Sequence, residues 1–125
     1  LEQYIERMNR YTSQHAILKI KDGYKFSWKD VITRPSNEFL SRYFFGEGYK
    51  DGLHGLALSL LQAFSELTVY LKIWQKEKFV EQNPTISEIS SLINEQEKEL
   101  HYWQADAMIK GGGGFIHRIR RKLKV

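Results

Sequence analysis

Apolar residues recur at helical spacing through most of this chain, and the breaks between the runs predict where each helix ends. The first predicted helix covers residues 1–21 and stops before Gly23, because glycine accepts the left-handed conformation that closes a helix. A short second helix is predicted over residues 27–33. Pro35 disfavours the helical conformation of the residue before it and separates this helix from an aromatic one over residues 36–45.

The most apolar stretch runs from Leu53 to Trp74 and is long enough for a helix that crosses a bilayer. A carboxylate inside hydrocarbon is costly, however, and four polar residues interrupt the stretch. We therefore expect a helix that is half-sunk in a membrane or packed in a helical core, rather than a true span. The interrupting residues are His54, Gln62, Glu66 and Lys72.

A long final helix is predicted from its start signal. Thr85 and Glu88 have the spacing of a capping box, in which each residue satisfies the other's free backbone N–H. Apolar residues then lie on one broad face as far as about Lys110. The glycines over 111–114 end the helix as a flexible linker before the tail over 115–125.

These patterns predict an all-α fold of several amphipathic helices, one strongly apolar, followed by a long capped helix and a basic tail. No segment alternates long enough to predict a strand. We divide the chain into residues 1–75, a helical membrane-associating region, residues 76–110, an amphipathic helix suited to oligomerisation, and residues 111–125, the linker and tail.

Positive charge gathers at the end of the chain. Lysine and arginine exceed aspartate and glutamate by 19 − 15 = 4, and the tail holds much of this excess. Such a tail predicts an anionic partner, which is lipid headgroups, nucleic acid or an acidic protein face. Nucleic acid is the weakest of these because no reader motif accompanies the charge, and a solvated tail is the alternative. The cations are Arg118, Arg120, Arg121, Lys122 and Lys124.

The residue types exclude several kinds of chemistry. There are no cysteines, and the four histidines are scattered without ligand spacing, so we expect no metal site in this chain. The chain also lacks a D-x-D motif. It starts at Leu1, already in helical rhythm, which predicts a segment of a longer protein. The given residues show no secretory signal.

Residues 1–75 carry, in order and without large gaps, a set of motifs that together are fairly specific. The set resembles the C-terminal region of bacterial family 2 glycosyltransferases, of the lipopolysaccharide-core and cell-wall-biogenesis glucosyltransferase type. Its first part, residues 1–12, resembles the family's segment just after the catalytic domain. The other matching residues are Arg34-Pro35, Phe39, Tyr43-Phe44, Gly48, Asp51-Gly52, Gly55, Ala57, Ala63-Phe64, Tyr70, Lys72 and Trp74.

The resemblance implies an enzyme that transfers a sugar from a nucleotide donor to a lipid-linked or lipopolysaccharide acceptor, at the cytoplasmic face of the inner membrane. The family's nucleotide fold, metal-binding D-x-D and catalytic base precede this region. The divalent metal and the nucleotide-sugar are therefore expected in an N-terminal catalytic domain that this chain lacks. We carry over no catalytic residue and expect the chain to be inactive alone, with that domain and the membrane lipid surface as partners.

Four residues are candidates for contact with a diphosphate or an acceptor. Arg7 and Arg10 offer the planar fork that matches phosphate oxygens, or they are solvated cations that pair with nearby glutamates. Asp51 can bind acceptor hydroxyls and His54 a phosphate, although Asp51 also suits the N-cap of the next helix. The neighbouring Gly52 favours a tight turn over a pocket.

Aromatic and cationic residues around the apolar stretch are candidates for a membrane interface, because rings prefer the headgroup layer and cations meet phosphates. An ordinary core face is the alternative. The candidates are Phe39, Arg42, Tyr43, Phe44, Phe45, Tyr49, Lys50 and Trp74.

Two functions follow from the sequence. One is the docking of a glycosyltransferase on the membrane beside its lipid acceptor. The other is a non-enzymatic helical module, in which the helix over residues 85–110 binds a partner or a second copy of the chain.

Overall fold

The structure, a computed structural model, describes residues 1–110, and within them it is all-helical, as predicted. The predicted linker and basic tail lie outside the described residues. Four α-helices form the fold, and a π-helical turn, η1, and a 3₁₀ turn, η2, connect the second to the third. Their bounds are α1 Glu2–Lys21, α2 Trp28–Leu40, η1 Ser41–Phe45, η2 Gly48–Asp51, α3 Gly52–Lys76 and α4 Ile86–Lys110.

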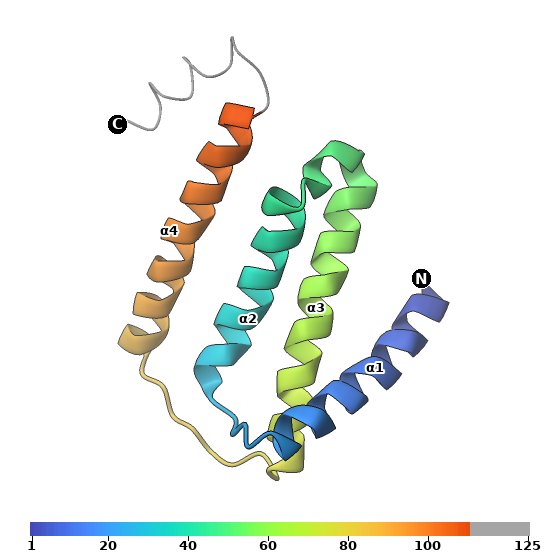
Figure 1. Cartoon of the computed structure of the whole chain (residues 1–125). Coiled ribbons are helices and arrows are strands. Elements are labelled where there is room, and N and C mark those ends of the chain that lie inside the picture. The colour runs from blue at the N-terminus through green and yellow to red at the C-terminus, as the bar shows by residue number, and fades with distance from the viewer. Residues whose placement is uncertain (111–125) are drawn as a thin grey trace.

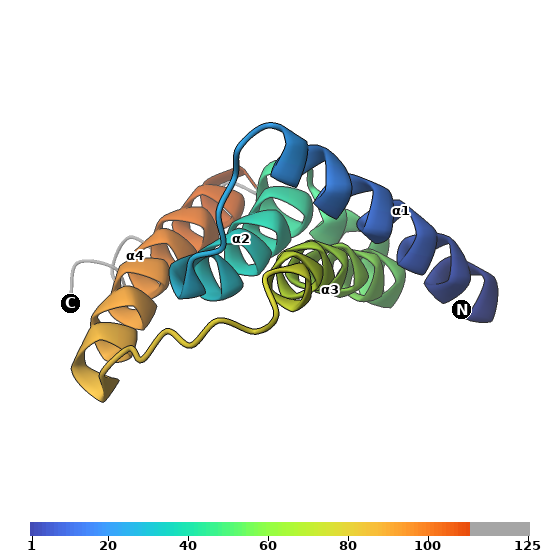
Figure 2. The same cartoon turned by 90° about the horizontal axis from the view of Figure 1, so that it is seen from below.

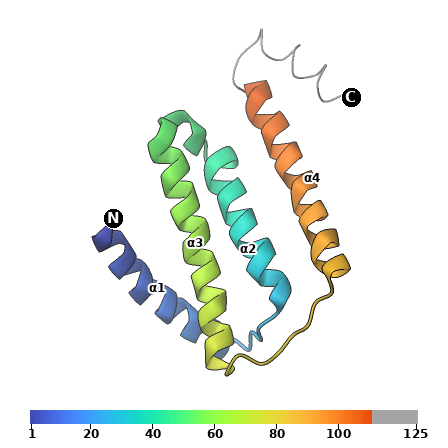
Figure 3. The same cartoon turned by 180° about the vertical axis from the view of Figure 1, so that it is seen from behind.

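Helices α2, α3 and α4 lie side by side, and α1 runs obliquely along one side of α3 (Figures 1 and 2). α1 diverges from α3 toward its own N-terminus, and among the described elements it contacts α3 alone. α4 contacts α2 and η1. α3 therefore takes the central place, and Figure 3 shows the arrangement from the side on which α3 lies in front of α1.

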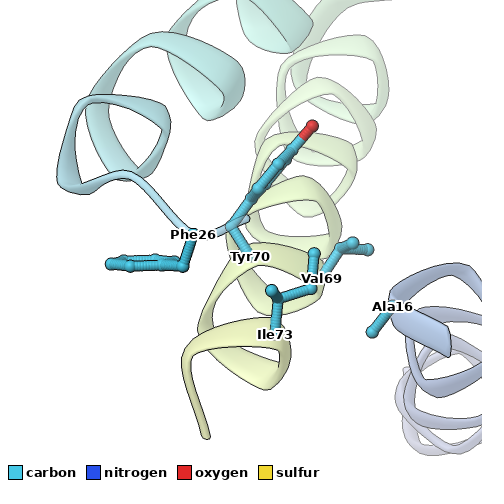
Figure 4. Close-up of a cluster of buried hydrophobic side chains, with 5 residues drawn as sticks. All are labelled: Ala16, Phe26, Val69, Tyr70 and Ile73. Atoms are coloured by element: carbon cyan, nitrogen blue, oxygen red, sulfur yellow. The ribbon is translucent and has the colours of Figure 1, made fainter. Parts of the chain in front are cut away.

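The core forms where α1, α2 and α3 converge. Val69, Tyr70 and Ile73 of α3 are fully buried there, with Ala16 of α1 and Phe26 of the loop before α2 (Figure 4). The Tyr70 ring meets the edge of the Tyr24 ring at a centroid distance of 5.5 Å, and the Phe26 ring stacks on Trp74 at 5.6 Å. The connection after α3 is tied to the same corner, because Gln82 Oε1 accepts the Trp28 backbone N–H at 2.8 Å.

The sequence prediction of a helix break at Pro35 is wrong, since α2 continues through it to Leu40. Proline in a helix interior removes one backbone hydrogen bond, so the helix needs compensation. The carbonyl that loses its donor is that of Val31, and partial burial of the Pro35 ring, on the side of α2 toward α4, offsets part of this cost. The predicted helix over 36–45 is thus the end of α2 followed by η1.

The predicted capping box at the start of α4 is confirmed. Thr85 Oγ1 accepts the Glu88 backbone N–H at 3.1 Å, and Glu88 Oε1 accepts the Thr85 backbone N–H at 3.1 Å. α4 nevertheless has no buried residue along its 25 residues. Its helical form therefore depends more on its own capping and side-chain pairs than on tertiary burial.

The corner between η2 and α3 depends on glycine. Gly52 has φ of +59°, a conformation that favours glycine, which agrees with the predicted tight turn. A Cβ on Gly55 would lie 1.7 Å from the carbonyl oxygen of Gly48, so the backbones of α3 and η2 touch there. This contact fixes where α3 begins relative to the aromatic residues of η1.

We expect Gly55→Ala to lower the free energy of unfolding by roughly 1–3 kcal/mol, because the new methyl group forces the two backbones apart. Thermal and urea unfolding monitored by circular dichroism would measure the loss. The control is Gly23→Ala, whose Cβ meets no atom within 4 Å and which tests the cost of a positive φ alone. If the two substitutions had equal effects, the close approach at Gly55 would not be limiting.

Candidate functional site

The most prominent surface feature is a row of uncovered apolar side chains along α3. The row follows the 4–3 spacing that keeps residues on one helix face. Exposed fractions are 78% for Leu53, 52% for Leu60, 53% for Phe64 and 38% for Leu71. We call this row the α3 face; it consists of Leu53, Ala57, Leu60, Phe64, Leu67 and Leu71.

Three of the four polar residues that interrupt this stretch, Gln62, Glu66 and Lys72, point to other sides of α3. Gln62 Nε2 donates to the Tyr4 hydroxyl of α1 at 2.9 Å. Lys72 Nζ donates to the Asn9 carbonyl and to Ser13 Oγ, both 2.7 Å away on α1. These contacts leave the α3 face without charge and place it on the side of α3 that α1 does not cover.

Glu66 is also turned away from the α3 face. It follows Phe64 by two residues, which is about 200° around a helix. Burial raises its pKa above the ordinary value, and the Glu38 carboxylate of α2 raises it further, although Lys19 and Arg34 act in the opposite direction. Its carboxyl group therefore lies among α1 and α2 side chains, so the sequence objection to membrane contact, a carboxylate in the apolar stretch, does not apply to this face.

The segment Gly48–Lys76, 29 residues long, has the length and composition of a membrane-crossing helix. One such helix is weak evidence by itself, since the core helix of a soluble protein also has these properties. A core helix is mostly buried, however, whereas only 22% of the apolar window is buried here. The described part of the chain thus buries about a fifth of this window, and the rest of the helix is half-buried or exposed.

The aromatic candidates pack on one another where α2 ends. Tyr43 stacks on Phe39 at 5.4 Å and meets Phe44 at 5.0 Å and Tyr49 at 6.2 Å between ring centroids. These four rings are half-buried, whereas Phe45 is 65% exposed beside Trp103 of α4. The structure thus brings the rings together, and their contact with lipid stays a prediction.

The remaining interface candidates have partners within the chain. Arg42 Nε lies 2.8 Å from Glu38 Oε1, and Lys50 Nζ lies 2.7 Å from Glu47 Oε2. Both pairs are largely exposed and add little stability. Trp74 Nε1 donates to the Val80 carbonyl at 2.9 Å, which holds this ring against the core.

The four candidates for diphosphate or acceptor contact are exposed and do not assemble into one site. Arg7 and Arg10 lie on α1, which does not contact η2, the element that carries Asp51. No ion pair of either arginine with a glutamate is present among residues 1–110. Asp51 occupies the N-cap position of α3 without a side-chain cap bond, and His54 lies in the first turn.

A cluster of charges between α1 and α2 was not anticipated. Lys19 Nζ of α1 and Arg34 Cζ of α2 lie 5.4 and 5.7 Å from the centroid of the Tyr70 ring. Arg34 also pairs with Asp30 one turn earlier, at 3.3 Å. The i, i+4 pairing on α2 could be read from the sequence, but the two cations on one ring depend on how α1 and α2 meet α3.

Residues 1–110 contain no group of three or more side chains that could hold a metal ion. Comparison of the chain with family models, with curated proteins and with solved structures finds no match.

We expect Glu66→Gln to raise the thermal unfolding midpoint at neutral pH. Because the pKa of Glu66 is raised on folding, the folded state holds its proton more tightly, and stability falls as pH rises above the ordinary glutamate range. Glutamine resembles the neutral form, so its advantage should disappear in acid, where the wild-type carboxyl is protonated in both states. Glu95→Gln, an exposed change on α4, is the control; the same pH profile in both variants would contradict the prediction.

Proposed function

We propose that this chain is the membrane-docking accessory part of a family 2 glycosyltransferase, which transfers a sugar from a nucleotide donor to a lipid-linked or lipopolysaccharide acceptor. The observation that carries the proposal is the α3 face, an uncovered apolar row whose polar neighbours turn toward α1 and α2. On a bilayer, this row would lie at the boundary between headgroups and acyl chains, with α1 on the water side.

The size of the α3 face fits peripheral attachment at the cytoplasmic side of the inner membrane. Moving a fully exposed Leu or Phe side chain out of water is favourable by about 1.5–3 kcal/mol of free energy. Four such side chains, at 78%, 52%, 53% and 38% exposure, could thus add roughly 3–7 kcal/mol on entering lipid. This binding free energy is close to that of one myristoyl chain, which gives only reversible membrane attachment. Stable attachment needs a second interaction, and the cations of residues 118–124 would supply it by attraction to anionic lipid.

The role in catalysis would be one of placement. The resemblance over residues 1–75 assigns the metal, the nucleotide-sugar and the catalytic residues to a domain outside this chain. Holding that domain on the surface where its lipid-linked acceptor diffuses raises the effective concentration of acceptor and limits its orientation.

A second candidate is a helical module that binds a partner or a second copy through the same face. The observation that favours it is the 4–3 spacing of the α3 face, which is also the spacing of a coiled-coil seam. The two functions differ in what binds the α3 face, which is lipid in the first and a protein chain in the second. One set of variants therefore tests both.

We expect Leu60→Gln/Phe64→Gln to weaken binding to vesicles of mixed anionic and neutral phospholipid by at least about tenfold, because half the burial of two large side chains is lost. Co-sedimentation at high salt would measure this in the chain with and without the residues after Gly114. The matched control is Ile17→Gln/Leu18→Gln on α1, where the exposed fractions are a similar 42% and 56%.

Two results would overturn the membrane proposal. The first is equal binding of the two double variants, and the second is failure of the wild-type chain to sediment with either lipid. A concentration-dependent dimer in analytical ultracentrifugation that only Leu60→Gln/Phe64→Gln abolishes would assign the α3 face to a second copy instead.

A further inference from the structure

A pocket of mixed polar and apolar character lies where the end of α2 and η1 meet α4. Its volume of about 570 Å³ is within the range of ordinary small-molecule sites. The buried side chain of Leu40 is part of its lining. Six further residues line it, and they are Asn37, Ser41, Phe45, Gln96, Glu99 and Trp103. The pocket thus combines four polar side chains with three apolar ones.

The six residues form two matched rows. α2 and α4 run in the same direction (Figure 1), and Phe45 of η1 meets Trp103 of α4 at 5.7 Å between ring centroids. Ser41 and Glu99 each come four residues before these rings, which is about one helical turn. One turn further back come the two amides, Asn37 and Gln96. The pocket therefore has aromatic rings at one end and polar side chains along the rest of its length.

The two rings at the end of the pocket form an aromatic corner. Their planes are 78° apart, and Phe45 is 65% exposed. Trp103 is half-buried and meets Tyr102 on its other neighbour contact at 5.3 Å, so it is held between two rings. The face of an aromatic ring carries partial negative charge and attracts groups with partial positive charge, such as the C–H bonds of a carbon that bears oxygen.

The polar side chains of the pocket are free to bind a ligand. None of the four makes a side-chain hydrogen bond to another of residues 1–110. Gln96 Oε1 is buried without a partner, and a ligand hydroxyl would supply the missing donor. Amide, hydroxyl and carboxylate groups together offer both donors and acceptors, which suits a ligand with several hydroxyl groups.

The charge and polarity of the lining separate the possible ligands. Glu99 is the one charged lining residue, so a phosphate or carboxylate ligand would meet repulsion and no cation. A hydrocarbon chain would leave the polar side chains unpaired. An amine would pair with Glu99 and the rings but not with the amides. A neutral ring with C–H bonds on its faces and hydroxyl groups on its edge satisfies all the lining groups.

We propose that this pocket binds a neutral pyranose sugar. The C–H face of the sugar packs on Trp103 and Phe45, and its hydroxyl groups donate to Glu99 and Gln96. The proposal goes beyond membrane docking and does not depend on it, because no residue of the α3 face lines the pocket.

The test is saturation-transfer NMR of the full chain titrated with the methyl glycosides of glucose, galactose and mannose. At least one should bind saturably, with transfer to its ring C–H protons. Glu99→Ala should weaken that binding at least about tenfold, because a charged acceptor is lost. The matched control, Glu95→Ala, changes an exposed glutamate one turn earlier and outside the pocket, and it should have no effect.

A second variant tests the rings. Trp103→Leu keeps an apolar contact with Phe45 but removes the indole face, so it should weaken glycoside binding by about three- to tenfold. Circular dichroism would establish that the variants keep their helices.

Three outcomes would overturn the proposal: no saturable binding of any glycoside, equal binding of sorbitol, which has hydroxyl groups but no ring, or equal effects of Glu99→Ala and Glu95→Ala. Binding of ethylamine in place of the glycosides would assign the pocket to a cation instead. Vesicle co-sedimentation separates this proposal from membrane docking. Glycoside binding without vesicle binding refutes docking alone, and the reverse result refutes the sugar site alone.

Discussion

The contact of α3 with both α1 and α2 determines where the other described elements lie. Tyr70 and Ile73 are fully buried at this contact, and the polar residues of α3 use the same sides of the helix. Lys72 reaches α1 through a backbone carbonyl and two side chains, which uses its donors fully. Since the inner sides of α3 accommodate Gln62, Glu66 and Lys72 as well as the core residues, the row from Leu53 to Leu71 is apolar.

This arrangement differs from the usual amphipathic helix, in which polar residues face water and apolar residues face the protein. The cost of placing Gln62 or Lys72 inward is offset because each meets a partner on α1. The cost on the outer side is that about half of each large side chain stays in water. A hydrocarbon environment would remove that second cost.

Local features of the fold could be predicted from the sequence, and features that depend on distant residues could not. The capping box of Thr85 and Glu88 involves residues three apart, and the turn at Gly52 needs only its own backbone. Pro35 misled the prediction, because α2 continues through it in the folded chain, where its ring is half-buried. Gln62 binds a residue 58 positions earlier, so the orientation of α3 needed the tertiary structure.

α4 has a different relation to the fold from the other helices. It carries its own cap and ion pairs and buries no residue, while the core among α1, α2 and α3 is complete without it. Two levels of cooperativity follow: the core unfolds as one unit, and α4 can open separately at a smaller free energy. The contact between α2 and α4 is therefore the part of the described fold that opens first, so Pro35 and Phe39 would meet water before the core unfolds.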